Sequence, residues 1–341
     1  HSTNTAKSTV MGGLGFIESI ELLSSGRRLQ YLSRDAYLCA LSDLPHDTRK
    51  GIEQSLFMDA VGNFAGATEK VFHIPILMSL FDNVRNTINA RFNEALRLRV
   101  TTTAGNHLKA AGDATPGSFT LDDMTLLAEY RRLPMPLDDK VVQEDFGDNQ
   151  PLTKVIYDYS EETTVPVTLK DDAIVPASVE IKDNGAVDAI FVIVKADLIT
   201  AADNTDAEQL ATDKPLECAN IKFEASGQTI LDVPGRYLEY LGKRTLGGGF
   251  YGTSPGKAGG TTETANLCYV YKIQMGLDHS SQYFSNLASL RELNTPTITV
   301  NIAKQSSDLD DKAGTVKVIV RKAMLMTTDA ASGKNSIGVS N

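Results

Sequence analysis

The feature that most constrains the fold is an internal repeat with an offset of about 200 residues. Residues 20–41 and 221–241 share an apolar–polar alternation that is interrupted by a Ser-Gly pair. Three further pairs of blocks follow in the same order: 72–76 with 271–275, 98–100 with 298–300, and 121–132 with 309–322. A single alternating block is weak evidence, because every half-buried strand has one. Four collinear blocks predict that the chain holds two copies of one structural unit.

Most of the repeated blocks predict β-strands. Apolar and polar residues alternate over 72–76, 96–100 and 316–320, which is typical of strands with one buried face. The run 189–194 is continuously apolar and predicts a strand that is buried on both faces. Because glycine tolerates a positive φ, Ser25-Gly26 and Ser226-Gly227 predict tight hairpin turns.

Short helices are expected in the connections between these strands. The segments 35–41 and 236–241 follow the two hairpins, and apolar residues recur at nearly helical spacing over 80–92. Many short strands with one or two helices in long connections are typical of jelly rolls. The sequence therefore predicts a mainly β chain with two tandem jelly-roll β-sandwiches and short helices in the connections, a double jelly roll.

Composition along the chain predicts the domain boundaries. Residues 1–15 and 327–341 are small and polar, so we expect a flexible N-terminal arm and a flexible C-terminal tail. The acidic stretch 136–151 follows Pro134, begins with Pro136 and is the expected linker. The first jelly roll then covers 16–135 and the second covers 152–326.

One strand of the first unit is unaccounted for. The strand expected at 187–196 precedes the second hairpin, and its counterpart in the first copy would lie before residue 1. Either that strand is missing from the first unit, or another segment completes its sheet. The strand-like segments 155–159 and 165–169 are the candidates for that role.

Two glycine-rich patterns resemble catalytic or cofactor motifs but lie in the wrong context. Gly252–Gly256 has the G-x-S-x-G spacing of a nucleophile elbow, yet Pro255 follows Ser254 and has no N–H to serve as an oxyanion donor. Gly247–Gly252 has the dinucleotide spacing, yet no helix can begin cleanly after it. We therefore expect no enzyme activity, no catalytic residue and no cofactor.

Metal sites are also weakly supported. The five histidines are scattered without metal-ligand spacing, so no metal residue is assigned. Asp308, Asp310 and Asp311 leave open a calcium site in a loop, with a solvated turn as the alternative, since Ala313 stands where an EF-hand requires glycine.

Cysteine and arginine positions predict ordinary structural roles. Cys39, Cys218 and Cys268 stand beside apolar residues and are expected to be small buried hydrophobes. Arg131-Arg132 and Arg321-Lys322 occupy equivalent strand ends, where they are expected to be solvated or at an interface.

Charge and hydropathy exclude further classes. The net charge of −10 argues against binding nucleic acid directly, since such binding needs clustered Lys and Arg. The longest exclusively apolar run has six residues, whereas a transmembrane helix needs about 20. The polar N-terminal residues lack the apolar core of a signal peptide.

Two tandem strand–Ser-Gly–strand–helix units, at 20–41 and 221–241, together with the segments 72–76, 80–92 and 95–103, resemble the double-jelly-roll major capsid proteins of tailless icosahedral viruses. The likeness is greatest to small versions from membrane-containing bacteriophages of the corticovirus and finnlakevirus types. The resemblance implies homotrimeric, pseudo-hexameric capsomers in the capsid of a virion, made in the host cytoplasm. It implies neighbouring capsomers, a vertex or penton protein and an internal viral membrane as partners.

The alternative function is a tandem jelly-roll carbohydrate-binding protein, either a lectin or a viral spike. Such proteins stack sugars on exposed aromatic side chains and often use calcium. The chain has no Trp and only 7% aromatic residues, which argues against this alternative.

Overall fold

The computed structural model describes residues 12–24, 26–56, 71–81, 96–102, 123–128, 132, 134–137, 139–140, 152–183, 185–197, 213–238, 251–253, 266–268, 270–275, 288–305, 307–328 and 335–339. The first half of the chain contributes the 3₁₀ helix η1 (Gly12–Phe16), β1 (Ile17–Ser24), β2 (Arg27–Ser33), α1 (Arg34–Ser42), α2 (His46–Ser55) and β3 (Leu96–Thr102). The second half begins with β4 (Leu152–Glu161), β5 (Val165–Thr168), β6 (Val175–Glu180), β7 (Ala186–Asp197), β8 (Asp213–Pro215), β9 (Cys218–Ala225) and β10 (Gln228–Val233). It continues with β11 (Tyr251–Thr253), β12 (Asn266–Cys268), β13 (Val270–Gln274), β14 (Ala288–Ser289), η7 (Leu290–Glu292), β15 (Thr297–Ile302), η8 (Ser307–Leu309), β16 (Ala313–Thr328) and β17 (Asn335–Val339).

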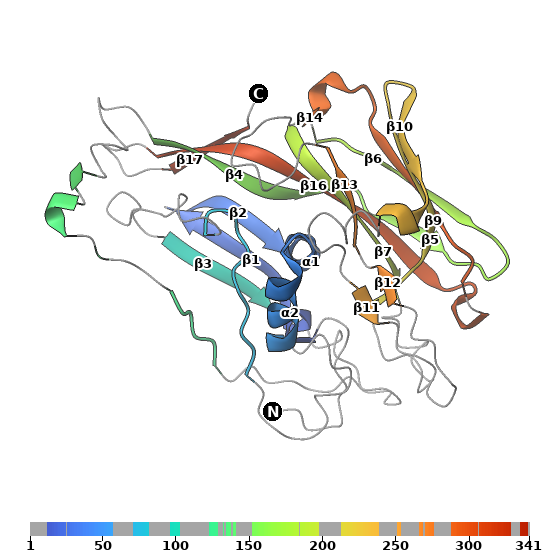
Figure 1. Cartoon of the computed structure of the whole chain (residues 1–341), viewed down its shortest axis with the longest axis horizontal. Helices are drawn as coiled ribbons and strands as arrows, with labels where there is room; N and C mark the ends of the chain where they lie inside the picture. Colours follow the sequence, from blue (N-terminus) through green and yellow to red (C-terminus); the bar gives the residue numbers. More distant parts are fainter. Residues whose placement is uncertain are drawn as a thin grey trace.

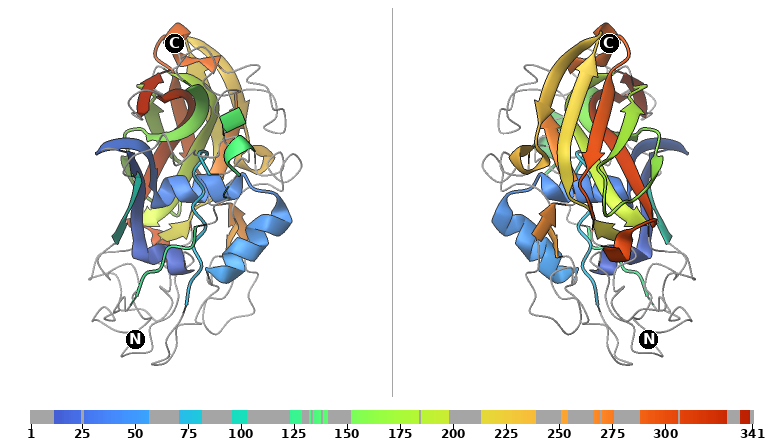
Figure 2. Two further views of the ribbon diagram at one scale, coloured as in Figure 1. Left: turned by 90° about the vertical axis from the view of Figure 1, so that its left-hand side faces the viewer. Right: turned by 90° about the vertical axis from the view of Figure 1, so that its right-hand side faces the viewer.

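The larger sheets are stacked in three layers (Figure 1). A three-stranded sheet has the order β2-β1-β3, and a four-stranded sheet has the order β10-β9-β15-β6. Between them lies an eight-stranded sheet built around β13-β7-β16-β17, which β4, β5, β8 and β14 also join. Figure 2 shows these layers edge-on, with β1–β3 in blue and teal on one side and β9 and β10 in yellow on the other. All strand pairs in the described ranges are antiparallel, and antiparallel sheets commonly have an alternating sequence pattern.

The strand order confirms two parts of the repeat. β1, β2 and β3 in the first unit occupy the same relative positions as β9, β10 and β15 in the second. The blocks 20–41 with 221–241 and 98–100 with 298–300 therefore correspond in three dimensions. The second sheet has one further strand, β6, on the outer side of β15.

The two hairpin turns have the predicted backbone. Gly26 has a φ of 80° and Gly227 a φ of 73°, and Ser226 before it also has a positive φ of 53°. Positive φ at both central residues defines a type I′ turn, whose twist matches that of the flanking strands. The space beside both glycines is open, so backbone conformation alone selects glycine here.

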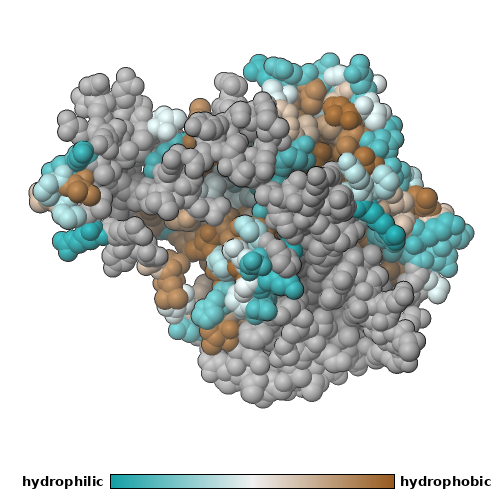
Figure 3. Space-filling view, in the orientation of Figure 1, coloured by the Kyte–Doolittle hydropathy of each residue, from teal (hydrophilic) through white to brown (hydrophobic). Residues whose placement is uncertain are grey.

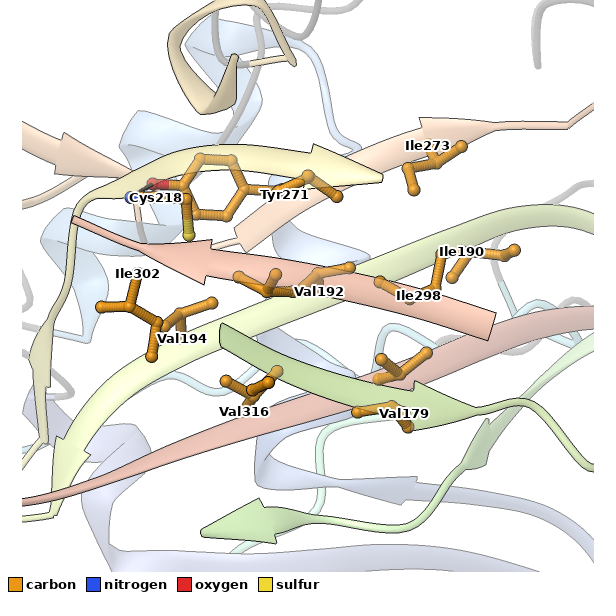
Figure 4. Packing of buried hydrophobic residues seen from close by; sticks show 14 of the residues in the cluster. Val179, Ile190, Val192, Val194, Cys218, Tyr271, Ile273, Ile298, Ile302 and Val316 are labelled. Carbon is orange, nitrogen blue, oxygen red and sulfur yellow. Dashed lines mark hydrogen bonds between the residues drawn. The ribbon is translucent and has the colours of Figure 1, made fainter. Parts of the chain in front are cut away.

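Strand β7 is buried on both faces, as its unbroken apolar run predicts. Phe191 and Ile193 are fully buried in the core between the three-stranded and eight-stranded sheets, which we call the first core. Ile190, Val192 and Val194 are fully buried in the core between the eight-stranded and four-stranded sheets, the second core. Because side chains alternate along a strand, one strand supplies both cores. Figure 4 shows the three second-core residues packed together with residues of β15.

The first core is completed by the second half of the chain. Ile156 of β4 is fully buried in it, and Tyr159 packs against it. Val165 and Val167 of β5 pack instead against the second core. Of the two segments considered for completing the first unit, 155–159 therefore contacts the first core and 165–169 does not. The domain boundaries remain a prediction.

Two segments that were expected to be strands have no ladder. Residues 71–78 are not assigned to a strand, although Ile74 and Ile76 pack against the first core as the alternation indicates. Residues 123–128 are exposed throughout and are not assigned to a strand, so the match of 121–132 with the beginning of β16 does not extend to a strand over 123–128. An apolar alternation predicts which side chains are buried in a core, but a β-strand also needs a neighbouring strand with which to exchange backbone hydrogen bonds.

Helices follow the hairpins as expected. α1 begins after Ser33, whose hydroxyl accepts a hydrogen bond from the Ala36 N–H at 3.1 Å. A helical turn covers 235–238 in the second unit. Most of the helix expected at 80–92 lies outside the described residues. No helix in the described ranges is long and apolar enough to cross a bilayer.

The expected arm, linker and tail contain some regular structure. η1 occupies Gly12–Phe16, and helical residues occur at 135–137 and 139–140. Within the expected tail, β17 pairs with Met324–Thr328 of β16. That pairing satisfies backbone groups which a free tail would leave to water.

Candidate functional site

The predicted surface motifs fall partly outside the described residues. Ser254, Pro255 and Gly256 lie outside them, as do 247–250. Tyr251–Thr253 form β11, which pairs with β12. The expectation that these patterns have no catalytic or cofactor role therefore remains a prediction.

The aspartates considered for calcium take part in a structured turn. The Lys170 ammonium pairs with the Asp311 carboxylate, and the Asp171 N–H donates to Oδ1 of Asp310 at 3.3 Å. Asp311 has a positive φ of 57°, and Leu309 beside it is buried in the second core. Within the described ranges, no group of three or more His, Cys, Asp or Glu side chains is arranged to hold a metal ion.

The cysteines that the structure describes are buried thiols. Cys39 lies in the first core and Cys218 in the second. Burial raises the pKa of the Cys218 thiol to about 12 and that of Cys39 well above its usual value. Neither is a reactive thiolate at neutral pH. The side chain of Cys268 lies outside the described set.

The main polar site is a set of eight charged side chains at the junction of α1 with the eight-stranded sheet, the junction cluster. Its members are Asp35, Asp43, Glu161, Asp188, Lys195, Lys272, Lys317 and Arg321. The two aspartates at the start and end of α1 belong to the first half of the chain. The other members come from β4, β7, β13 and β16 in the second half. The cluster therefore joins the two repeats.

Arg321 is the centre of one half of this cluster. Its Nε donates to Oδ1 and Oδ2 of Asp188 at 2.9 and 3.1 Å, and its Nη2 donates to Oδ2 at 2.8 Å. Its Nη1 donates to Asp43, which also accepts from Lys272. The guanidinium carbon lies 5.4 Å from the ring centroid of Phe191. This planar, bidentate contact explains why arginine occupies the position.

The prediction for Arg321 as a solvated strand-end residue is wrong. Its strand continues to Thr328, and Arg321 is only 3% exposed. It does lie at an interface, although the interface is between the two halves of one chain. Lys322 points to the other face and pairs with Asp183 at 2.6 Å. Arg131 lies outside the described residues.

Asp35 is the centre of the other half. The Lys317 ammonium lies 2.5 Å from Asp35 Oδ2 and 3.4 Å from Glu161 Oε2, and Lys195 lies 3.9 Å from Asp35 Oδ1. Burial raises the pKa of the Asp35 carboxyl, but attraction to Lys195 and Lys317 outweighs burial and lowers that pKa to about 2. Asp35 is therefore a charged anchor and not a proton donor at neutral pH.

The chemistry of the junction cluster is structural. Each carboxylate named here has a cationic partner within ion-pair distance. Ion pairs of this kind fix the position of α1 on the sheet, because a shifted helix would leave charges buried without partners. In the sequence, Lys317, Ile319 and Arg321 are spaced two residues apart in β16, so they share one face of the strand. That pattern is equally typical of a solvated face.

Among the described residues, five of the ten exposed large apolar side chains lie in the segment 124–137, which belongs to the connection between β3 and β4. Leu127 is 82% exposed, and Met124, Leu126, Met135 and Leu137 are all more than half exposed. Figure 1 shows the helical residues of this connection, in green, at one end of the molecule. Exposed apolar side chains gathered in one segment are typical of an interaction surface.

The fold is that of known capsid proteins. The chain superposes with a TM-score of 0.69 and 11% identity on VP54 of PBCV-1, as fitted into a reconstruction of the virophage Sputnik, covering 100% of this chain and 88% of that one. The quasi-atomic model of the PBCV-1 virus capsid superposes with a TM-score of 0.65 and 11% identity, covering 100% of this chain and 88% of that one. The mavirus major capsid protein superposes with a TM-score of 0.50 and 10% identity, covering 98% of this chain and 79% of that one. These likenesses show that the chain has the double-jelly-roll fold.

Sequence comparison alone finds no relative. No protein-family profile matches the chain, and no curated protein matches it in sequence. The bacteriophage type expected from the resemblance remains a prediction, because the structures that superpose with a TM-score of 0.50 or more come from PBCV-1, mavirus, the Sputnik virophage and Faustovirus.

Proposed function

We propose that this chain is a major capsid protein, the structural subunit of an icosahedral virion. The observation that supports this most directly is the superposition of the whole chain on VP54 of PBCV-1 at a TM-score of 0.69. A fold can host several functions, so shape alone does not assign one. The well-superposed structures nevertheless come from viral shells, and none is described as a lectin.

The repeat supports a homotrimeric capsomer. Each chain presents two units whose hairpin sheets have the same strand order, β2-β1-β3 and β10-β9-β15. Three such chains around one axis would place six similar units in a ring. Closed rotational symmetry of this type is the usual state of homo-oligomers. The exposed apolar side chains around Leu127 are candidates for contacts between neighbouring chains.

The other partners follow from the resemblance. We include neighbouring capsomers, a vertex or penton protein and an internal viral membrane. The net charge of −10 supports a shell that does not hold the genome directly. We propose a structural role without catalysis, which the pairing of the buried carboxylates with lysine and arginine supports.

Light scattering on the purified chain tests this function. A stable particle of three chains has a mass of about 111 kDa, three times 36.9 kDa, and is expected to keep that mass on dilution. Negative-stain electron microscopy of the same particle should then show pseudo-hexagonal outlines. A chain that remains monomeric at all concentrations and binds sugars on a glycan array would instead favour the carbohydrate-binding alternative.

A further inference from the structure

The two repeated hairpin sheets each turn one face away from the cores. The three-stranded sheet covers the first core and the four-stranded sheet covers the second, with the eight-stranded sheet between them. Figure 2 shows the two hairpin sheets on opposite sides of the molecule. Because side chains alternate along a strand, every second residue points away from the core. We call the resulting surfaces the first outer face, on β1–β3, and the second outer face, on β6, β9, β10 and β15.

Six positions correspond one to one on the two outer faces, because the strand registers are the same. On the first face, each of two β1 residues lies between a β2 residue and a β3 residue. On the second face, each of two β9 residues lies in the same way between β10 and β15. The corresponding rows are Tyr31, Glu21 and Arg99 with Asp232, Lys222 and Thr299, and Arg28, Leu23 and Arg97 with Thr229, Glu224 and Thr297.

The first outer face carries an excess of positive charge. The side chains of Arg28 and Arg99 are 60% and 64% exposed, and Arg97 is also exposed. Glu21 lies 3.8 Å from Arg28 and 3.2 Å from Arg99, so one carboxylate is shared by two guanidinium groups. Among the described residues, Arg97 has no ion-pair partner. This face therefore presents uncompensated arginine to solvent.

The second outer face carries the opposite excess on the same scaffold. Threonines stand at the three positions that hold arginine in the first face, and the position of Glu21 is taken by lysine. That lysine, Lys222, pairs with Glu224 at 2.7 Å. Asp232 and Glu180 are exposed, and within the described ranges Glu180 has no ion-pair partner. This face therefore presents uncompensated carboxylates.

The opposite charges also have matching spacing. Arg28 and Arg97 lie in one row on β2 and β3, with β1 between them. Glu224 and Glu180 lie in the equivalent row on β9 and β6, with β15 between them. Adjacent strands are about 4.8 Å apart, so each pair spans roughly 10 Å. Two arginines of one chain can therefore face two glutamates of another.

Hydropathy does not distinguish these faces, whereas charge does. Figure 3 shows hydrophilic and hydrophobic residues side by side where Figure 1 draws β6, β9 and β10. Ile230 of β10 is 52% exposed, and Leu23 and Tyr31 are partly exposed on the first outer face. A mixture of this kind is usual in interfaces that form between folded chains.

We propose that the first outer face of one chain docks on the second outer face of a second copy of the same chain. This proposal rests on the homotrimer proposed above and names the surfaces that form it. Like faces repel each other and unlike faces attract, so the charges select a head-to-tail contact. A head-to-tail contact closes into a ring of three when each chain is turned by a third of a full turn relative to the last.

Charge reversal tests the proposal by light scattering over a dilution series. One variant carries Arg28→Glu and Arg97→Glu, and a second carries Glu180→Arg and Glu224→Arg. Each makes the two docking faces alike in charge, so its trimer should dissociate at a concentration at least about tenfold higher than the unmodified trimer. The variant with all four substitutions exchanges the signs of both faces and should recover most of that loss.

A matched control separates docking from net charge. Lys50 on α2 and Arg291 on η7 are exposed and lie outside both outer faces. Lys50→Glu with Arg291→Glu changes the net charge as much as Arg28→Glu with Arg97→Glu does. This control should leave the dissociation midpoint unchanged. High salt should promote dissociation of the unmodified trimer, because it screens contacts between exposed charges.

Two results would overturn the proposal and leave the homotrimer in place. One is an unmodified trimer whose midpoint neither reversed pair changes. The other is a loss in the first variant that the four-substitution variant does not recover, because the arginines would then contact something other than the second outer face. An unmodified chain that stays monomeric at all concentrations would reject the homotrimer together with this contact.

Two single variants keep the test valid if a double reversal prevents folding, which circular dichroism would show. Arg97→Glu and Glu180→Arg each change a side chain without an ion-pair partner among the described residues. Both should raise the dissociation midpoint, and the two together on one chain should raise it less than either alone. Midpoints that stay equal to that of the unmodified chain would reject the proposed contact.

Discussion

Replacing Arg321 with methionine tests whether the junction cluster holds the two halves of the chain together. The variant removes the three hydrogen bonds that the guanidinium donates to Asp188 and the one that it donates to Asp43. Methionine has no charge, and its unbranched side chain can occupy the space of the aliphatic part of Arg321 while the guanidinium over Phe191 is removed. The loss is therefore electrostatic more than steric.

The expected cost follows from burial. Removing one partner of a buried ion pair leaves a charge without compensation and costs about 3–5 kcal/mol of unfolding free energy. Asp43 keeps the Lys272 ammonium, so most of the cost arises at Asp188. Arg236 with Glu217 provides a matched control, since these side chains lie 2.9 Å apart but Arg236 is 80% exposed. Arg236→Met should cost less than about 1 kcal/mol.

Urea unfolding at pH 7 measures both costs. The chain has no Trp, so far-ultraviolet circular dichroism or tyrosine fluorescence reports the transition. A double variant, Arg321→Met with Asp188→Leu, completes a thermodynamic cycle and should recover much of the lost stability. A coupling energy below about 1 kcal/mol between Arg321 and Asp188 would refute the reasoning.

Three further predictions concern single side chains. Gly26→Val should lower the free energy of unfolding by about 1–3 kcal/mol in the same urea assay, because valine is strained at a φ of 80°. The control Gly51→Ala lies in α2, where the space beside the glycine is open, and should not destabilise the chain. Asp35→Asn should lower the free energy of unfolding by about 2–3 kcal/mol at pH 7. This difference from the unmodified chain should shrink as the pH falls from about 4 towards 2, since the pKa of Asp35 in the folded chain lies below the unfolded value of 3.8. Asp158→Asn should stabilise the chain at pH 7 by up to about 3 kcal/mol, because burial raises the pKa of the Asp158 carboxyl to about 6. The cost of ionising Asp158 in the folded chain grows as the pH rises from about 4 to 6. Equal stability of the variant and the unmodified chain at pH 7 would contradict this.

The candidate site could be predicted only in part. The alternation of Lys317, Ile319 and Arg321 shows that these side chains share one face of a strand. It does not show whether that face meets water or another layer. Lysine and arginine on a strand usually indicate a solvated face, and only the packing of α1 against β16 turns them into buried ion-pair partners.

Some of this protein follows from the sequence by itself. The hairpins at Gly26 and Gly227 and the doubly buried run 189–194 are local properties, set by the φ that a residue tolerates and by a period of two. The tandem repeat is likewise visible without coordinates.

Only the tertiary structure decided which layers meet. An alternating pattern states that a face is buried but not what buries it, because strand pairing joins segments far apart in the chain. The pattern therefore could not show that 71–78 and 123–128 are not assigned to strands, or that β4 contributes to the first core. The same holds for the junction cluster, whose charges are paired across some 280 residues of sequence, as in the contact of Lys317 with Asp35.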